Sequence, residues 1–399
     1  MLQELERRDQ TGKASTPPVP AVRAKRDPVD QAPSATPPAT TTASLGTTVE
    51  NCGLFEEFEP KAIGMTYTFE APADGEPFSL PVRFEGRRTD VSGEPTAADR
   101  FSLVETVDPV LPGTGRLTLT RRVENLAPGE WTVSAWPVPE SGSPAGRPLP
   151  ARAEASGITG FAPIIRVRAP GVRLGAWPGM VALGAVVALT VLGLLAARAG
   201  FPVVPVLLLA FVACLVGILG ARLYYRAEQL FRRRTGAGVQ GMCIQGFVLA
   251  AVGTVVVGAI PLGVPLGGLL DATAPGLLFG MAIGRVGCFL GGCCAGRPTR
   301  SRFGLWSSDR RLGVRRIPTQ LVESVTALIV GLVALLVVSV SAPVPAGGVF
   351  AAAMAAFVLG RQLVFPLRAM ARNTSYGRLL ATAVSLVVLI GVVAATVLG

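Results

Sequence analysis

Histidine is absent from the 399-residue chain, so the side chain that most often acts as a general base near neutral pH is missing. Residues 176–399 also lack lysine and hold only four acidic residues against 18 arginines, whereas residues 1–175 hold 22 acidic and 19 basic residues. The net charge of +11 therefore arises in the second half of the chain. That half is apolar and offers no polar basic face, which argues against nucleic-acid binding and favours membrane interfaces or phosphate headgroups.

Cysteine is too unevenly placed for a disulfide framework. Five of the six cysteines lie after residue 176, and Cys288, Cys293 and Cys294 fall within seven residues. A metal site or a redox pair is one interpretation of these three, but no second cluster supplies a fourth zinc ligand. Small packing residues are the favoured interpretation, and we predict neither a metal nor a cofactor.

Residues 1–50 have few large apolar side chains and are rich in proline, alanine and threonine. Such a composition cannot bury a core, so we expect a disordered leader. It contains no apolar run of the kind found in a cleavable signal peptide.

Residues 51–174 show short alternating runs separated by glycine, proline and aspartate. Trp131, Val133 and Ala135 alternate with polar residues, as a strand with one buried face requires. This spacing predicts a small immunoglobulin-like β-sandwich, an accessory module that could engage an unknown protein partner. The candidate strands are Ala62–Glu70, Phe78–Phe84, Phe101–Val107, Gly115–Val123, Glu130–Val138 and Pro163–Val167.

Residues 175–399 contain seven apolar stretches, each close to the ~20 residues that cross a bilayer core. Backbone groups must be satisfied inside the bilayer, so these stretches are predicted to be helices. The predicted fold is a polytopic α-helical membrane protein with about seven transmembrane helices, preceded by the all-β domain. The stretches are 176–197, 201–224, 240–262, 266–290, 320–341, 347–366 and 377–398.

The loops between these stretches differ sharply in arginine content. Arginines crowd the loops after the second, fourth and sixth stretches, while the alternate loops carry almost none. By the positive-inside rule, the arginine-rich loops and the N-terminal domain would be cytoplasmic.

The fourth stretch carries an arginine among small residues. Gly276, Gly280 and Gly284 repeat every four residues, a spacing that lets another backbone or an acyl chain pack closely. Arg285 lies among them, and a buried intramembrane arginine costs at least about 2.5 kcal/mol, so it needs a partner or a function. It could hold a lipid phosphate, pair with Asp271 or Glu323, or reach an interface.

The sixth stretch poses the same question with Arg361. Seven residues further on, Arg368 falls on the same helical face. Two arginine sites on separate helices could clamp one phosphate, although a position at the helix end explains Arg368 equally well.

Three motifs resemble one enzyme family. Gly284-Arg-Val-Gly-Cys-Phe-Leu-Gly-Gly-Cys-Cys-Ala-Gly296, followed by Arg-Pro-Thr299, resembles the signature of prolipoprotein diacylglyceryl transferases, and is most similar to their GCC-type members. Pro318-Thr-Gln-Leu-Val-Glu323 and Gly220-Ala-Arg-Leu-Tyr224 resemble two further elements of the family. The resemblance runs in order over residues 176–399.

The resemblance implies a plasma-membrane enzyme of bacteria. It would transfer a diacylglyceryl group from phosphatidylglycerol to the lipobox cysteine in the signal peptide of a prelipoprotein, among membrane lipids, and release glycerol phosphate. Arg285 would hold the phosphate, Arg361 would stabilise the leaving group, Glu323 would orient an arginine and Gln245 would position substrate. The matched substrate-binding positions are Arg222, Gly284, Gly287, Cys288, Gly292, Gly296, Thr319, Gln320 and Arg368.

The chain departs from the family pattern where histidines are expected. Gln245 and Ile317 occupy the two family histidine positions, and Phe365 occupies that of a glutamate. A free thiol is already a few per cent thiolate at pH 7, so loss of a base would slow the reaction without abolishing it.

Two alternatives to the enzyme follow from the same residues. A lipid-binding relative without catalysis would use the β-sandwich to engage a partner. A transporter is disfavoured because no internal repeat is visible. The family also works at the outer face of the membrane, which conflicts with the arginine count.

Overall fold

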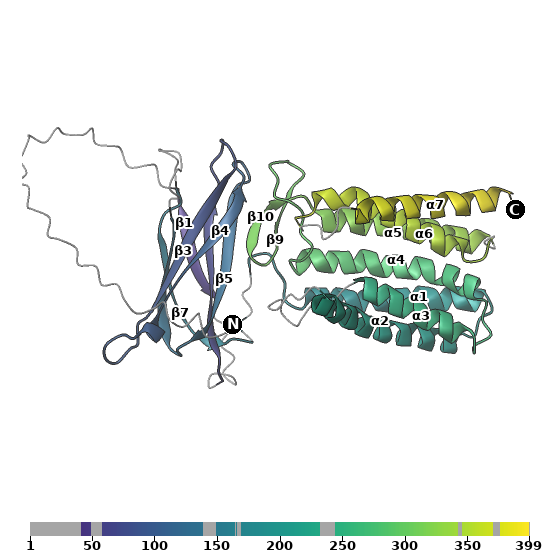
Figure 1. The fold of residues 1–399 in the computed structure, drawn as a ribbon, viewed down its shortest axis with the longest axis horizontal. Coiled ribbons are helices and arrows are strands. Elements are labelled where there is room, and N and C mark those ends of the chain that lie inside the picture. Colours follow the sequence, from purple (N-terminus) through teal and green to yellow (C-terminus); the bar gives the residue numbers. More distant parts are fainter. Residues whose placement is uncertain are drawn as a thin grey trace, which may run out of the picture. The chain divides into compact units, whose positions relative to one another are not determined.

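The computed structural model describes residues 41–48, 58–138, 149–163, 165, 169–231, 244–341, 345–369 and 376–398. A β-rich region comes first and is followed by a bundle of helices (Figure 1). The first eight strands are β1 (Ala43–Thr48), β2 (Lys61–Glu70), β3 (Phe78–Arg88), β4 (Arg100–Val110), β5 (Arg116–Leu126), β6 (Glu130–Pro137), β7 (Ala153–Ile158) and β8 (Gly160–Phe161).

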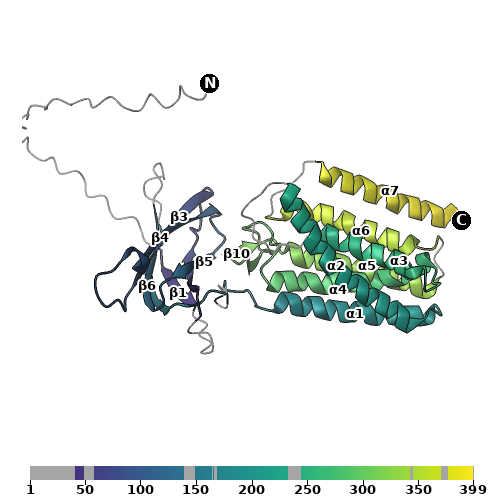
Figure 2. The ribbon, with the colours of Figure 1, turned by 60° about the horizontal axis from the view of Figure 1, so that its bottom comes forward.

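The strands form two antiparallel sheets that face each other (Figures 1 and 2). One has the order β4-β3-β6-β7; in the other, β1, β2 and β5 are neighbours and β8 also pairs with β2. Trp131, Val133 and Ala135 on β6 are fully buried, which confirms the buried face predicted from the sequence, although Ser134 between them is buried too. They share one core with Tyr67 on β2 and Phe84 on β3, so this core joins both sheets.

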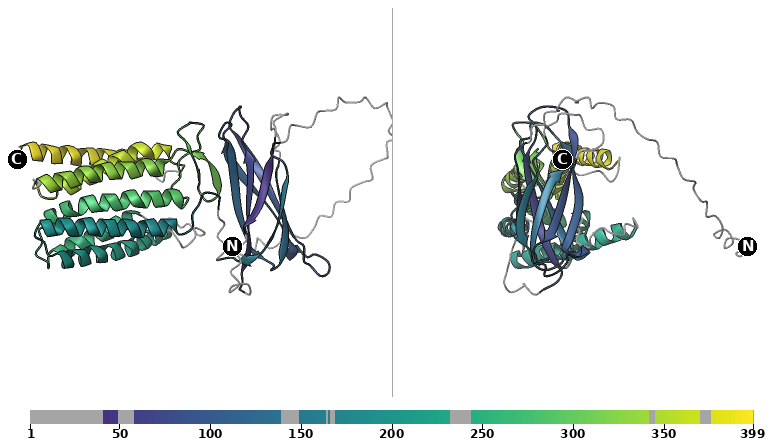
Figure 3. Two further views of the ribbon diagram at one scale, coloured as in Figure 1. Left: turned by 180° about the vertical axis from the view of Figure 1, so that it is seen from behind. Right: turned by 90° about the vertical axis from the view of Figure 1, so that its left-hand side faces the viewer.

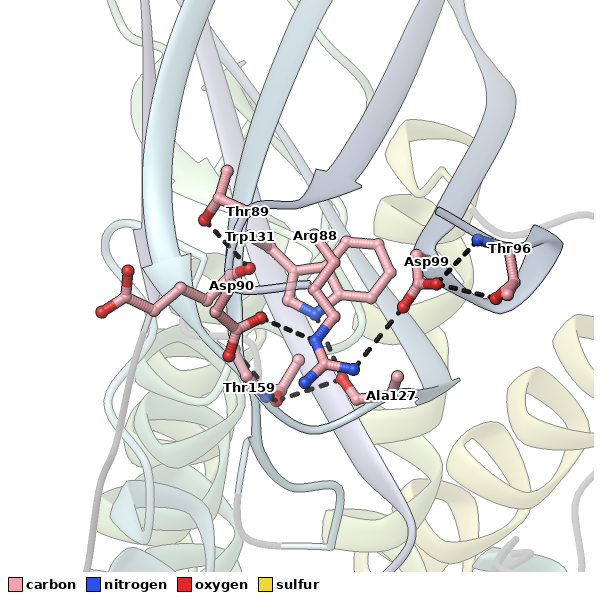
Figure 4. A network of polar contacts seen from close by, with 10 residues as sticks. Arg88, Thr89, Asp90, Thr96, Asp99, Ala127, Trp131 and Thr159 are labelled. Atoms are coloured by element: carbon pink, nitrogen blue, oxygen red, sulfur yellow. Dashed lines mark hydrogen bonds and ion pairs between the residues drawn. The ribbon is translucent and has the colours of Figure 1, made fainter. Parts of the chain in front are cut away.

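A polar network closes one end of this sandwich (Figure 4). Arg88 forms ion pairs with Asp90 at 2.6 Å and with Asp99 at 3.5 Å. The Asp99 carboxylate also accepts hydrogen bonds from the backbone N–H and the hydroxyl of Thr96. The indole Nε1 of buried Trp131 donates to the Ala127 carbonyl at 3.1 Å. The charges at this end of the core are therefore paired.

The limits of the β domain differ from the prediction. β1 lies inside the expected leader and pairs with β2 over its whole length, so the domain includes Ala43–Thr48. The expected strand Pro163–Val167 is not found among its described residues, Pro163 and Ile165. Two strands precede it instead, β7 and β8. The first 40 residues of the expected leader lie outside the described residues.

Among the described residues seven α-helices follow, one for each apolar stretch, although α2 continues to Phe231, beyond its predicted end at residue 224. All except α3 are long and apolar enough to cross a membrane, and the apolar part of α3 spans Gly246–Ala259. The chain is thus a multi-pass membrane protein preceded by an antiparallel β domain. The helices are α1 (Ala176–Arg198), α2 (Val203–Phe231), α3 (Ile244–Ala259), α4 (Leu266–Leu290), α5 (Thr319–Val340), α6 (Gly348–Val364) and α7 (Gly377–Leu398).

Helix α4 occupies the centre of the bundle and contacts α1, α3, α5 and α6 (Figures 1 and 3). Its glycines permit the closest of these contacts. A Cβ on Gly276 would lie 2.5 Å from the Ala188 carbonyl oxygen, and one on Gly280 would lie 2.9 Å from that of Gly184. The small-residue spacing therefore serves backbone-to-backbone packing of α4 on α1.

A hairpin from the membrane half completes the larger β-sheet. Strands β9 (Leu305–Ser308) and β10 (Leu312–Arg316) lie between α4 and α5 in the sequence. β10 pairs with β5, which gives the order β1-β2-β5-β10-β9. Leu312 and Val314 are buried in the sandwich core. The predicted boundary at residue 175 therefore does not separate the β domain from the rest of the chain.

This pairing also bears on how often the chain crosses the membrane. β5 precedes α1 and β10 follows α4, yet the two strands are hydrogen-bonded and so lie on one side. An even number of crossings must separate them. If α1, α2 and α4 each span, as their length and composition permit, α3 must cross as well, and the described helices would then make seven crossings.

Candidate functional site

One carboxylate joins two arginines where α4 ends, α5 begins and the chain leaves α6. Glu323 on α5 is 1% exposed, and its Oε2 lies 2.9 Å from Nε of Arg285 on α4. Its Oε1 forms an ion pair with Nη2 of Arg368, which is itself buried. Two cations share one anion, so the cluster keeps a net positive charge. The Arg285 side chain remains 14% exposed and reachable.

The backbone around Arg368 explains how it reaches this position. Helix α6 continues into a 3-10 turn, Phe365–Leu367, which contains Pro366 and ends the helix. The chain then pairs with the segment after α4, where Gly296 and Arg368 form an antiparallel bridge. The N–H groups of Arg297 and Ala369 donate across this bridge at 2.8 and 3.0 Å. Arg368 is thus fixed by backbone pairing as well as by its ion pair.

Arg361 approaches the same cluster from α6. Its guanidinium interacts electrostatically with Arg285, Arg368, Glu323 and Cys294. Among the described residues it has no ion pair, in contrast to Arg285 and Arg368. Arg361 is therefore the cation of this cluster whose charge remains available to a ligand.

The loop after α4 is wound back against the start of α5. Gly292 and Cys294 adopt left-handed backbone conformations, with φ of +64° and +56°, and Cys293 N–H donates to the Cys288 carbonyl at 3.0 Å. From α5, Gln320 Nε2 donates to the Cys293 carbonyl at 2.9 Å and the Thr319 hydroxyl to that of Cys294 at 3.5 Å. Two residues of the predicted site thus hold the cysteine loop rather than face an open space.

Gly296 is needed where this loop meets the chain before α5. A Cβ there would lie 2.1 Å from the Ile317 carbonyl oxygen. The Gly296 carbonyl accepts a hydrogen bond from Arg316, which is 2% exposed and also pairs with Asp309 at 2.7 Å. Gly296 therefore permits the close approach that positions Arg368.

The other predicted glycines have separate surroundings. A Cβ on Gly287 would lie 2.7 Å from Met180 Cβ of α1, and one on Gly292 would lie 2.9 Å from the Ser308 carbonyl oxygen of β9. Gly284 differs, because no atom lies within 4 Å of the position its Cβ would occupy. Space therefore remains beside Arg285 on α4.

Of two further predicted site residues, one lies apart from the cluster and the other has no described side chain. Arg222 is exposed on α2, and in the described ranges no hydrogen bond or ion pair joins it to the arginines. Gln245 is a residue of α3 whose side chain lies outside the described parts. Their roles remain predictions.

Asp271, one candidate partner of Arg285, has another role. It is 2% exposed, and its two carboxylate oxygens accept hydrogen bonds from the backbone N–H groups of Gly347 and Phe350 at 2.7 and 2.9 Å. It thereby caps the N-terminus of α6, where a negative charge is stabilised. Among the pairings considered for Arg285, the one with Glu323 is found.

Sequence reasoning missed that Glu323 binds two arginines and that Arg368 is buried. Two features of the sequence could have predicted this: Glu323 is the only acidic residue of α5, and Arg368 lies seven residues after Arg361. No feature of the sequence predicted that β10 pairs with β5 or that Arg316 is buried.

The arrangement is suited to binding an anion. Arg285 and Arg368 come from separate parts of the chain, with Arg361 nearby, and among the described residues Glu323 is the acidic group paired with them. Guanidinium groups in a site of low polarity hold phosphate strongly and stabilise negative charge that develops on it.

Comparison with known proteins agrees with this chemistry. Residues 165–398, more than half of the chain, match the prolipoprotein diacylglyceryl transferase family. Three similar proteins carry the name phosphatidylglycerol–prolipoprotein diacylglyceryl transferase. That of Clostridium tetani is 27% identical over 165 residues, which cover 39% of this chain and 66% of that protein. That of Dehalococcoides mccartyi is 45% identical over 67 residues, 16% of this chain and 26% of that protein. That of Chloroflexus aggregans is 35% identical over 100 residues, which cover 23% of this chain and 32% of that protein.

These matches span at most 66% of the relatives' own length. The family match, by contrast, runs from just before α1 almost to the end of α7. It includes all three arginines of the cluster and Glu323. The chain belongs to the prolipoprotein diacylglyceryl transferase family.

Proposed function

We propose that this chain transfers the diacylglyceryl group of phosphatidylglycerol to the lipobox cysteine thiol of a prelipoprotein and releases glycerol phosphate. The observation that carries the proposal is the buried carboxylate of Glu323, which pairs with Arg285 and Arg368, beside Arg361, which has no ion pair among the described residues. The names of the similar proteins support the same donor and acceptor.

The arginines have different roles toward the lipid phosphate. Arg285 is partly exposed and follows Gly284, where a Cβ would meet open space, so we assign it to the phosphate of the incoming lipid. Arg361 has no competing ion pair and stabilises the charge that grows on the leaving phosphate. Glu323 fixes Arg285 and Arg368, so their positions are set before the lipid binds.

We further propose that the protein lies in the bacterial plasma membrane with its β domain outside. The arginine count favours the opposite side, but the loop between α4 and α5 uses its arginines structurally. Arg310 donates to the Gly291 carbonyl at 2.8 Å, Arg311 pairs with Glu105 at 2.8 Å and Arg316 pairs with Asp309. Arginines retained for such contacts make the count a poor guide to orientation.

Transfer can be tested with the purified full chain in micelles that contain phosphatidylglycerol. The acceptor is a peptide with a lipobox cysteine, and the readout is the added mass of one diacylglyceryl group. We expect product from the unmodified protein and a loss of about 100-fold or more in Arg285→Ala. Arg198→Ala, which changes an exposed arginine at the end of α1, is the matched control and should retain activity.

A lipid-binding relative without catalysis is the second candidate, and the absence of histidine favours it. The same preparation separates the two. Binding of phosphatidylglycerol without product, in protein that is folded, would contradict the transferase and make the partner of the β domain the main question.

A further inference from the structure

Three thiols meet where α4 ends. The Sγ atoms of Cys288, Cys293 and Cys294 all lie within 4.8 Å of one another. Zinc–thiolate bonds of about 2.3 Å in a tetrahedral site place sulfur ligands about 3.8 Å apart. The three sulfur atoms therefore need to approach by no more than about 1 Å to bind one ion. The sequence favoured packing residues because a fourth ligand was missing, and the geometry reopens that question.

The backbone holds these cysteines in place before any ion binds. The Cys293 and Cys294 carbonyls accept hydrogen bonds from Gln320 and Thr319 of α5, both fully buried. Cys294 also adopts a left-handed backbone conformation, which is uncommon for a residue other than glycine. Such strain is found where a side chain must be aimed at a site.

One side of the cluster is left open. Gly284 precedes Cys288 by one turn on the same face of α4, and no atom lies within 4 Å of the position its Cβ would occupy. Cys293 and Cys294 are only partly buried. Three protein ligands with an open fourth position are the pattern of catalytic zinc sites, whereas structural sites are closed by four ligands.

We propose that Cys288, Cys293 and Cys294 bind one thiophilic divalent cation, Zn²⁺, and that the acceptor cysteine thiol occupies its fourth position. The second half of this proposal rests on the proposed function. A thiol bound to zinc is deprotonated, so the ion supplies the acceptor thiolate in a chain that contains no histidine.

The surrounding charges suit this assignment. Arg285, Arg361 and Arg368 all interact electrostatically with Cys294. Zinc with three thiolates carries one negative charge, Glu323 a second and the lipid phosphate a third. Together they balance the three arginines, and the thiolate that arrives with the acceptor is consumed in the reaction.

The transfer step balances without an oxidant or a second co-reactant. The acceptor thiol loses its proton to solvent as its sulfur binds zinc. The sulfur lone pair then attacks the glyceryl carbon that carries the phosphate ester, and the carbon–oxygen bond breaks. The electron pair leaves with glycerol phosphate, and the neutral thioether product, a weak ligand, dissociates from zinc.

The test uses the reduced full chain in micelles, in a parent variant with Cys52, Cys214 and Cys243 changed to serine so that the three clustered thiols remain. Cobalt(II), added alone, reports thiolate ligation through sulfur-to-metal charge-transfer absorption. We expect one equivalent to bind, to be displaced by zinc, and to be lost in Cys288→Ser or Cys294→Ser. A lipobox-cysteine peptide should then shift the absorption, while the same peptide with serine should not.

Several outcomes overturn the proposal. A parent that binds less than one equivalent, or that binds cobalt without charge-transfer absorption, has no thiolate site. If the cobalt absorption does not change when the cysteine peptide is added, the ion has no role in activating the acceptor thiol. The same holds if transfer activity is equal in protein stripped of metal by a chelator and in the same protein after zinc is added back. A cobalt site that responds to the cysteine peptide, in protein that never forms product, would leave the metal site standing and refute the proposed function alone.

Discussion

Arg285 Nε lies 2.9 Å from Glu323 Oε2, and this ion pair connects the central helix α4 to α5. The other oxygen of Glu323 pairs with Arg368 beyond the end of α6, so one carboxylate links three parts of the membrane half. In a medium of low polarity such a group cannot be removed without leaving two cations uncompensated.

Glu323→Gln should therefore destabilise the protein and abolish transfer. Breaking a buried ion pair by removing one partner costs about 3 kcal/mol or more, because the remaining charges stay buried. Thermal unfolding of the full chain in micelles measures the first effect and the peptide assay the second. Unchanged stability would show that Glu323 does not hold the arginines.

Gly296→Ala should be far more disruptive than Gly284→Ala. The first places a Cβ 2.1 Å from the Ile317 carbonyl oxygen and forces apart the segment that positions Arg368; the second meets no atom within 4 Å. Overpacking of this kind costs about 1–3 kcal/mol. Unfolding temperatures of the two variants provide a matched comparison, and equal effects would contradict the described geometry.

Asp271→Ala should lower stability without disturbing the arginines. The variant loses the cap on α6, a change worth about 1–2 kcal/mol. The affinity for phosphatidylglycerol should stay near that of the unmodified protein, since Glu323 remains. A loss of lipid binding as large as that of Arg285→Ala would reinstate Asp271 as a partner of the cluster.

Acid should weaken the end of the sandwich shown in Figure 4. The hydrogen bond from Arg88 holds the pKa of Asp90 below its usual value, and hydrogen bonds from Thr96 do the same for the pKa of Asp99. Carboxylates with a lowered folded pKa stabilise the protein above about pH 4 and lose that contribution as the pH falls through the folded value. Unfolding of Arg88→Gln should depend less steeply on pH below about pH 4; an identical profile would assign the acid sensitivity elsewhere.

Cysteines introduced at Glu94 and Ile260 should be labelled from opposite sides of the membrane. Both positions are exposed, and three helices separate them if α3 crosses. A membrane-impermeant maleimide applied to intact cells and to inverted vesicles measures the side. Labelling of Glu94→Cys in intact cells supports a β domain outside, and labelling of both from one side would contradict seven crossings.

The sequence predicted the elements of the membrane half more fully than their contacts. Apolar length decides where a helix can span, so each of the seven stretches contains a helix, and the largest difference is at the end of α2. The alternation around Trp131 likewise predicted a buried strand face. The partner of Arg285 was left open between Asp271 and Glu323, because helix periodicity does not say which faces meet.

The pairing of β10 with β5 could not be predicted. Leu312 of β10 is aligned with Leu119 of β5, almost two hundred residues earlier in the sequence. Four membrane helices, α1 to α4, lie between the two strands. β10 is only five residues long and ends in two arginines, so its sequence is typical of a charged loop rather than of a strand. The arginine asymmetry is a weak guide to orientation for a related reason, since Arg310, Arg311 and Arg316 have fixed partners.

That pairing sets an order on biosynthesis. The sandwich emerges first from the ribosome, but two residues of its core, Leu312 and Val314, are translated only after α1 to α4. Until then β5 presents an unpaired edge, so an N-terminal fragment ending before α1 would be prone to edge-to-edge association. Maturation of the domain thus waits for insertion of the first four helices. The arginine cluster is completed later still, because Arg361 and Arg368 are translated after β10.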